Sequence, residues 1–173
     1  MASYYYLMSS LPMLRAGETP PLDYAAFLSQ CQGVVSEKVY RTLEGLTVRS
    51  EGGGFMGRWA EFYRVLTNEL NYERRVKRGE SCAVPSERDA AVTQTATTAV
   101  NAANPLEGER RLLALEFDRL DELIGLHSFD DCALYGYALK LQLLERQRAF
   151  RRDEGKAAFD ALLGQVRQQI FSL

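Results

Sequence analysis

The sequence is poor in the residues that most often bind metals or form covalent bonds. It contains one histidine, His127, and three cysteines among 173 residues. Cys31, Cys82 and Cys132 are widely spaced and form no CxxC pair, so no zinc-binding or redox motif is present. We interpret them as reduced cysteines that pack as small apolar side chains. The sequence therefore predicts no metal and no cofactor.

Motifs of known catalytic chemistry are also missing, among them H-E-x-x-H and G-x-S-x-G. A catalytic His127 would need a nucleophile within hydrogen-bond reach, and Ser128 and Cys132 are its nearest candidates along the chain. A histidine at a junction between helices is more often a partner of a helix dipole or a loop residue. The nearby acids are interpreted as first-turn residues or a solvated helix face rather than metal ligands: Asp118, Asp121, Glu122, Asp130 and Asp131. We predict that the protein is not itself an enzyme.

A strong charge of one sign and long apolar runs are absent as well. The formal net charge is −2, with 25% charged residues, and such a balance produces no global field that attracts nucleic acid. The longest apolar run is too short to span a bilayer, and the N-terminus lacks the basic start and apolar run of a secretory signal. We therefore expect an intracellular protein without a membrane-spanning helix.

The most informative stretch runs from Asn104 to Phe150. Asn104 and Pro105 open a helical pattern that ends near Gly125, and its apolar residues recur at alternating spacings of four and three: Leu113, Phe117, Leu120 and Ile124. Ser128 is then predicted as the N-cap of a second helix, over 129–150. That helix is apolar almost all round, so it must be covered on every side and is predicted to be the central helix of the fold.

Further helices are predicted over 22–32, from Ser36 to Gly45, over 55–77 and from Asp153 onward. The last of these has an apolar face made of Phe159, Leu162, Leu163, Val166 and Ile170. The stretch 89–103 is alanine- and threonine-rich, and reads as a helix capped near Ser86 or as a mobile connection. In the N-terminal segment 3–12, the three tyrosines favour a strand, whereas the spacing of the apolar residues favours a helix. In either case we expect the segment to pack onto the rest of the domain.

These patterns together predict an all-α protein, an irregular bundle of six or seven helices around a long antiparallel helix pair. We expect one helical domain over 1–173, with a weak sub-boundary at 79–103 between an N-terminal helical part and the C-terminal bundle.

Two clusters of basic residues are candidates for binding a partner. The first lies at the end of the 55–77 helix: Arg74, Arg75, Lys77 and Arg78. Its ordinary explanation is favourable interaction with the helix dipole, and its functional one is contact with an acidic partner or with lipid headgroups. The second cluster is Arg146, Arg148, Arg151 and Arg152. Acidic residues balance both clusters, so we expect no nucleic-acid binding.

Several short motifs resemble a small bacterial protein family associated with V-type ATPase gene clusters. They are Tyr4-Tyr5-Tyr6-Leu7 through Ser10-Leu11-Pro12, Asn68-Glu69-Leu70, Asn104-Pro105-Leu106-Glu107, Leu120-Asp121-Glu122-Leu123, His127-Ser128-Phe129-Asp130, and the run 138–146. The likeness is strongest in the first dozen residues and in roughly the last two-fifths of the chain. That family resembles a shortened C subunit of A/V-type ATPases, which is called d in the eukaryotic enzyme.

The resemblance implies an all-helical, non-catalytic protein at the cytoplasmic side of the inner membrane. Its partners would be the central-stalk subunits and the membrane proteolipid ring of a V-type ATPase, which it would couple or help to assemble. The full C subunit is longer and is built from three similar helical bundles, so this chain would hold only part of that design. The alternatives are a freestanding helical adaptor and, third, a hydrolase that uses His127.

Overall fold

The computed structural model describes residues 2–148 and 160–164, and within them every regular element is a helix. The seven main helices are α1 (Ala2–Ser10), α2 (Tyr24–Cys31), α3 (Glu37–Glu44), α4 (Phe55–Lys77), α5 (Ala90–Val100), α6 (Pro105–Ile124) and α7 (Asp131–Arg148). A short helical segment at 160–164 follows. The prediction of an all-α bundle with six or seven helices is therefore confirmed. Most of the predicted last helix lies outside the described residues.

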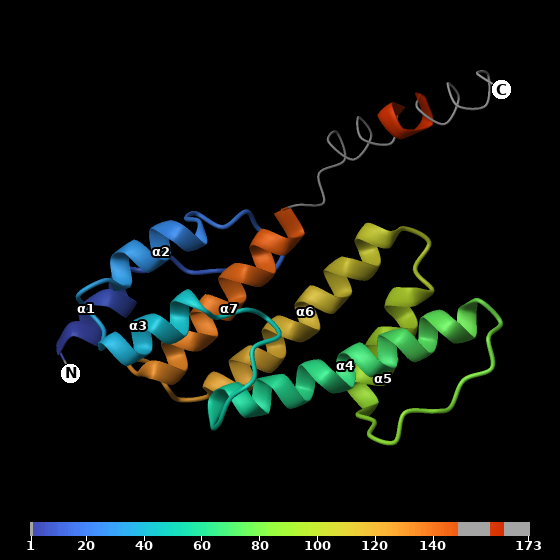
Figure 1. Ribbon diagram of the computed structural model, residues 1–173, viewed down its shortest axis with the longest axis horizontal. Coiled ribbons are helices and arrows are strands. Elements are labelled where there is room, and N and C mark those ends of the chain that lie inside the picture. Colours follow the sequence, from blue (N-terminus) through green and yellow to red (C-terminus); the bar gives the residue numbers. More distant parts are fainter. Residues whose placement is uncertain (1, 149–159, 165–173) are drawn as a thin grey trace.

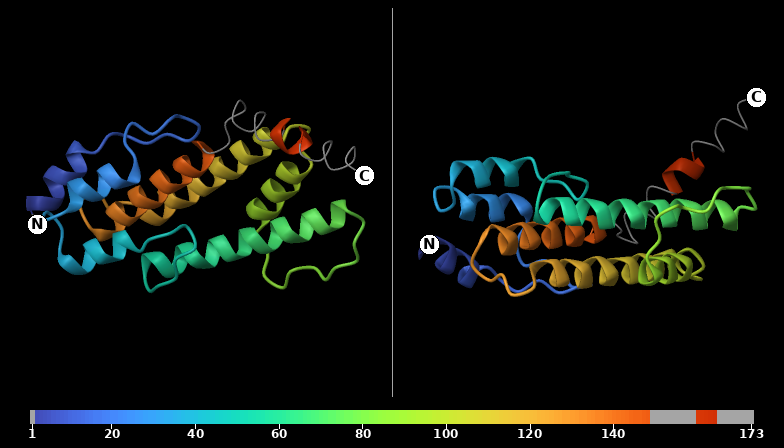
Figure 2. Two further views of the ribbon diagram at one scale, coloured as in Figure 1. Left: turned by 45° about the horizontal axis from the view of Figure 1, so that its top comes forward. Right: turned by 90° about the horizontal axis from the view of Figure 1, so that it is seen from below.

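The antiparallel pair of α6 and α7 forms the middle of the molecule (Figure 1). Helix α7 packs against α6 on one side and against α2 and α3 on the other, as both views in Figure 2 show. Its buried residues lie all round the helix and include Leu134, Leu139, Leu141, Leu143 and Leu144. Burial of such a set on every face is what its apolar sequence requires.

The N-terminal segment is a helix, which decides between the two alternatives left open by its sequence. Leu7 of α1 is buried, and Leu11 just after the helix is buried as well, while Tyr5 and Tyr6 are exposed. The Tyr4 hydroxyl donates to the Asp131 carboxylate at the start of α7, and the Tyr137 hydroxyl donates to the Pro12 carbonyl at 3.0 Å. These contacts dock α1 onto the central helix, as the apolar area of the segment predicts.

Helices α4, α5 and α6 pack side by side at the other end of the molecule (Figure 1). Gly108 of α6 permits the closest approach, because a Cβ at this position would lie 2.6 Å from the Ala99 carbonyl oxygen of α5. Most of the stretch 89–103 is thus helix α5, in which Val92, Ala96 and Ala99 are buried. Small side chains suit it because the two backbones approach so closely.

Two helix starts differ from the sequence prediction. Asp89, not Ser86, caps α5, and its carboxylate accepts from the backbone N–H groups of Ala91 and Val92 at 2.9 and 3.1 Å. Asp130, not Ser128, caps α7 by accepting from the Ala133 N–H at 3.1 Å. In each case an aspartate two or three residues further along lies directly before the first helical turn, where a cap must be.

Two buried carboxylates, which the sequence patterns do not reveal, link elements of the bundle. Glu69 of α4 is fully buried and accepts from Arg88 Nε at 2.7 Å and Nη2 at 3.1 Å. Glu116 of α6 is buried and is paired in the same two-pronged way with Arg146 of α7. Such forked pairs satisfy carboxylates that could not otherwise be removed from water.

No helix among the described residues is both long enough and apolar enough to cross a bilayer.

Candidate functional site

The predicted partner-binding cluster lies at the C-terminal end of α4, where all four of its side chains are exposed. Glu80, in the following loop, accepts from Arg78 Nε at 2.6 Å and from Arg75 Nε at 3.0 Å. The hydrogen bonds from these two guanidinium groups lower the pKa of the Glu80 carboxyl. Arg75 and Arg78 are therefore partly neutralised within the chain itself.

Lys77 contributes to the fold rather than to an open surface. Its ammonium group donates to the carbonyl oxygen of Val100, the last residue of α5. A cation beside the unpaired carbonyls of a helix C-terminus is favourable. Lys77 thus ties the end of α4 to the end of α5.

Arg74 is the member of the cluster that stays available to a partner. Within the described ranges 2–148 and 160–164, no carboxylate lies within ion-pair distance of its guanidinium group. Arg74 lines a cleft of about 240 Å³ between α4 and α6, together with Arg49, Asn71 and Glu109. Arg49 and Arg74 also line the adjoining hollow along α4, together with polar residues such as Thr67 and Asn71 and the acids Glu51 and Glu61.

This arrangement changes the predicted interface in one respect. Among the described residues, Arg49 and Arg74 are the basic side chains of these hollows without an ion pair, and they share the hollows with the acids Glu51, Glu61 and Glu109. Arg75 and Arg78 at the end of α4 are paired with Glu80. No pattern pointed to Arg49, because it lies in a loop 25 positions before Arg74 along the chain. Only the packing of the 45–54 loop beside α4 places the two side chains on one groove.

The second basic cluster does not form a continuous charged surface in the described part of the chain. Arg146 turns inward to Glu116, to which it donates at 2.7 and 3.2 Å, and Arg148 is exposed at the end of α7. Arg151 and Arg152 lie outside the described residues. The absence of nucleic-acid binding stays a prediction.

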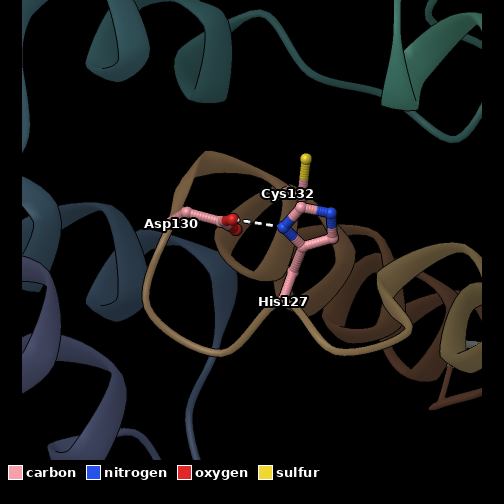
Figure 3. A group of neighbouring side chains, drawn as sticks. All are labelled: His127, Asp130 and Cys132. Atoms are coloured by element: carbon pink, nitrogen blue, oxygen red, sulfur yellow. Dashed lines mark hydrogen bonds and ion pairs between the residues drawn. The ribbon is translucent and has the colours of Figure 1, made fainter.

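His127 lies in the turn between α6 and α7, as its sequence position predicts, and its neighbours there are Asp130 and Cys132 (Figure 3). The His127 Nδ1 atom is hydrogen-bonded to Asp130 Oδ2, and the Cys132 Sγ lies within 4.8 Å of the donor atoms of both residues. The neighbouring Asp131 carboxylate accepts from the Tyr4 hydroxyl. The structure therefore brings Cys132, one of the two candidate nucleophiles, close to His127.

The thiols of Cys31 and Cys132 are not activated as nucleophiles. Burial raises the pKa of the Cys31 thiol to about 11. Burial also raises the pKa of Cys132, and the Asp130 and Asp131 carboxylates add to the effect while Arg58 opposes it. Because the thiolate is the reactive form, these surroundings disfavour nucleophilic catalysis at neutral pH.

The remaining acids considered as metal ligands are exposed on the surface of α6. Asp121 accepts from Lys140, and Glu122 accepts from Arg119 at 2.8 Å. Asp118 is exposed as well, so all three acids lie on a solvated helix face, as interpreted from the sequence.

Comparisons with protein-family models, with curated proteins and with solved structures found no match for this chain.

Proposed function

We propose that the protein is a non-catalytic component of a V-type ATPase, similar in role to the C subunit of these enzymes. It would couple the central rotor stalk to the membrane proteolipid ring or assist assembly of the complex. The observation on which the proposal rests is that the segments most similar to the V-type-associated family, at the two ends of the described chain, pack together.

The contacts between these segments join residues that are far apart in sequence. Tyr4 is hydrogen-bonded to Asp131, which lies 127 positions further along the chain. Tyr137 is hydrogen-bonded to Pro12, 125 positions away, and the Tyr5 ring packs on Phe129 with 4.9 Å between centroids. Residues that resemble the family therefore belong to one structural unit, which supports a shared fold rather than two chance likenesses.

The central helices also suit a mechanical role. A coupling element transmits force through packed, stiff parts and needs no reactive group. Helices α6 and α7 pack against each other, and the Glu116–Arg146 pair links them. Close packing between two helices makes the helix pair resist deformation.

The groove lined by Arg49 and Arg74 is the surface that we assign to an acidic partner, such as a protein of the central stalk or an acidic loop of the ring. Complementary charge at such a contact sets orientation and association rate more than affinity. Arg74 has no ion pair among the described residues, so a partner's carboxylate would not have to displace an existing one.

The test is co-purification with V-type central-stalk subunits. We expect Arg74→Glu and Arg49→Glu each to weaken recovery of the complex by about tenfold, with the larger loss for the double variant. Arg41→Glu is the matched control, because Arg41 is exposed on α3, pairs only with Glu37 among the described residues, and is not among the residues that line the groove. Circular dichroism would verify that each variant is folded.

Two results would count against the proposal in different ways. Recovery without any of the V-type subunits would refute the function. Recovery with these subunits that is unaffected by Arg49→Glu and Arg74→Glu would refute only the assigned groove.

A second candidate function is a freestanding adaptor, favoured by an exposed aromatic group at the α1 end. Tyr5, Tyr6 and Phe129 are exposed, and Tyr6 retains 73% of its accessible surface. The Tyr5 ring contacts both of the others. Apolar groups of this kind mark contact sites for other proteins. Capture of a partner unrelated to V-type ATPases, lost in Tyr6→Ser, would support the adaptor.

A further inference from the structure

The turn between α6 and α7 holds three different metal-binding groups within six residues. They are the imidazole of His127, the carboxylate of Asp130 and the thiol of Cys132, with one donor atom from each lying within 4.8 Å of the others (Figure 3). The His127 and Asp130 side chains are 47% and 45% exposed, so an ion could reach them from solvent. Cys132 is half-buried beside them at the start of α7.

Backbone hydrogen bonds hold the turn that supports these groups. Gly125 adopts a φ of +54°, which ends α6, and its N–H donates to the Asp121 carbonyl at 2.9 Å. The His127 N–H donates to the Ile124 carbonyl at 3.0 Å. Asp130 uses Oδ1 to cap α7, which leaves Oδ2 directed at the histidine ring. The donor atoms of His127 and Asp130 are thus positioned before any ion binds, which reduces the ordering cost of binding.

The mixture of donors determines the class of ion. Ca²⁺ and Mg²⁺ take oxygen ligands, whereas a site with one nitrogen, one sulfur and one oxygen suits Zn²⁺ and similar divalent transition ions. Bonds of about 2.0 to 2.3 Å in a tetrahedral site bring ligand atoms to roughly 3.3 to 3.8 Å from one another. The observed spacing of up to 4.8 Å exceeds this range, so binding requires the Cys132 side chain to turn toward the His127–Asp130 pair.

We propose that His127, Asp130 and Cys132 bind one Zn²⁺ ion through Nδ1, Oδ2 and Sγ, with water as the fourth ligand. Binding releases the thiol proton of Cys132 to the solvent. The proton shared by His127 Nδ1 and Asp130 Oδ2 also leaves, to the solvent from an imidazolium or to Nε2 by exchange with solvent from a neutral imidazole, and each of the two side chains then forms a bond to the metal. The imidazole then holds its remaining ring proton on Nε2. The thiolate and the carboxylate together balance the charge of the ion.

The metal would act as a structural tie across the α6–α7 turn. The same turn presents Phe129 against Tyr5, and Asp131 next to it binds Tyr4. A bound ion would therefore fix the corner of the molecule on which α1 docks. This inference is independent of the proposed V-type function, because it depends only on the geometry of the turn.

The experiment uses untagged, reduced full-length protein and Co²⁺ as a spectroscopic substitute for Zn²⁺. We expect saturable binding of one Co²⁺ per chain, with a thiolate-to-cobalt charge-transfer band that Zn²⁺ abolishes by competition. Cys132→Ser should remove the band, and His127→Ala should weaken binding by more than about tenfold. Cys82→Ser is the matched control and should keep both the band and the affinity, since Cys82 lies in the 79–89 loop.

Asp130→Asn guards against a loss of folding, because asparagine is as good an N-cap as aspartate but is a poorer ligand. We expect this variant to fold and to bind Co²⁺ more weakly than the wild type. Zn²⁺ should also raise the unfolding temperature of the wild type and not that of Cys132→Ser, because a ligand that binds only the folded state stabilises it. The proposal is overturned if the wild type has no charge-transfer band, if the band persists in Cys132→Ser, or if it disappears in Cys82→Ser instead.

Discussion

The guanidinium group of Arg146 on α7 holds the buried carboxylate of Glu116 on α6 through hydrogen bonds of 2.7 and 3.2 Å. The Tyr63 hydroxyl on α4 lies 3.5 Å from the same guanidinium group. Three helices therefore meet at one ion pair. Burial of Glu116 raises the pKa of its carboxyl, and the attraction and hydrogen bonds of Arg146 oppose this effect. Removal of only one partner should consequently lower the free energy of unfolding by a large amount.

We expect Arg146→Leu to destabilise the fold by roughly 3 kcal/mol, because it leaves an uncompensated carboxylate in the interior. The double variant with Glu116→Leu should recover most of this loss, since two apolar groups of similar volume replace the pair. Urea unfolding measures both. Arg111→Leu is the control: Arg111 forms an exposed pair with Glu107 on the same helix, and such pairs contribute less than about 1 kcal/mol. Additive losses in the double variant would contradict this account.

Gly108→Ala should separate α5 from α6. A Cβ at Gly108 would lie 2.6 Å from the Ala99 carbonyl oxygen, a backbone atom that cannot rotate away. We expect a loss of about 1–3 kcal/mol in the free energy of unfolding, the usual cost of overpacking. Gly53→Ala, where no atom lies within 4 Å of the added Cβ, should have a much smaller effect. Equal effects of the two substitutions in thermal unfolding would show that the close approach is not important.

The N-cap of α5 distinguishes the structure from the sequence prediction. Asp89→Ala should cost about 1 kcal/mol, because two backbone N–H groups lose their acceptor. Ser86→Ala should change little, since the helix begins four positions later at Ala90. Chemical denaturation of the two variants measures the difference. A larger loss for Ser86→Ala would restore the cap predicted from the sequence.

Stability should fall at alkaline pH as buried tyrosines ionise. Burial raises the pKa of Tyr137 from 10.0 to about 12. Because the folded pKa is the higher one, the contribution of Tyr137 is full below pH 10 and is lost as the pH rises toward 12. At neutral pH we expect Tyr137→Phe to cost about 1 kcal/mol through the lost bond to Pro12.

The free energy of unfolding of the wild type and of Tyr137→Phe, measured from pH 8 upward, tests this account. The difference between them should narrow above pH 10, because only the wild type has the contribution that ionisation removes. Parallel curves across that range would contradict the assignment.

Much of the helical framework is predictable because the signals are local. The predicted helix over 55–77 coincides with α4, and Asn104 and Gly125 bound α6 as expected. An apolar stripe and residues with special backbone or capping properties act within one or two turns of the chain, so a short window contains them. The two misplaced caps have the same origin. Each region offers more than one capping residue, and the packing of the helix decides where its first turn starts.

The candidate sites depended on contacts between distant parts of the chain. The basic end of α4 was visible in the sequence, but its internal partners Glu80 and Val100, and the contribution of Arg49 to the neighbouring groove, were not. The group of His127, Asp130 and Cys132 matches none of the ligand spacings sought in the sequence. Its three donors come from a turn and the first residues of a helix rather than from one regular element. Assignment to a V-type complex and division of the chain at 79–103 stay predictions.

The sequence by itself determined that the chain forms helices, where most of them lie, and that the helix over 129–150 must be central. Hydrophobic periodicity and capping chemistry are sufficient for this prediction, because both depend only on residues that lie a few positions apart in the sequence. Only the tertiary structure decided which charges are buried in pairs and which remain open. It places Arg146 on Glu116 and Arg88 on Glu69, across 30 and 19 positions of sequence, and leaves Arg74 facing a groove. The residues next to a charged side chain along the sequence do not reveal its ion-pair partner. The partner is determined when the helices pack together.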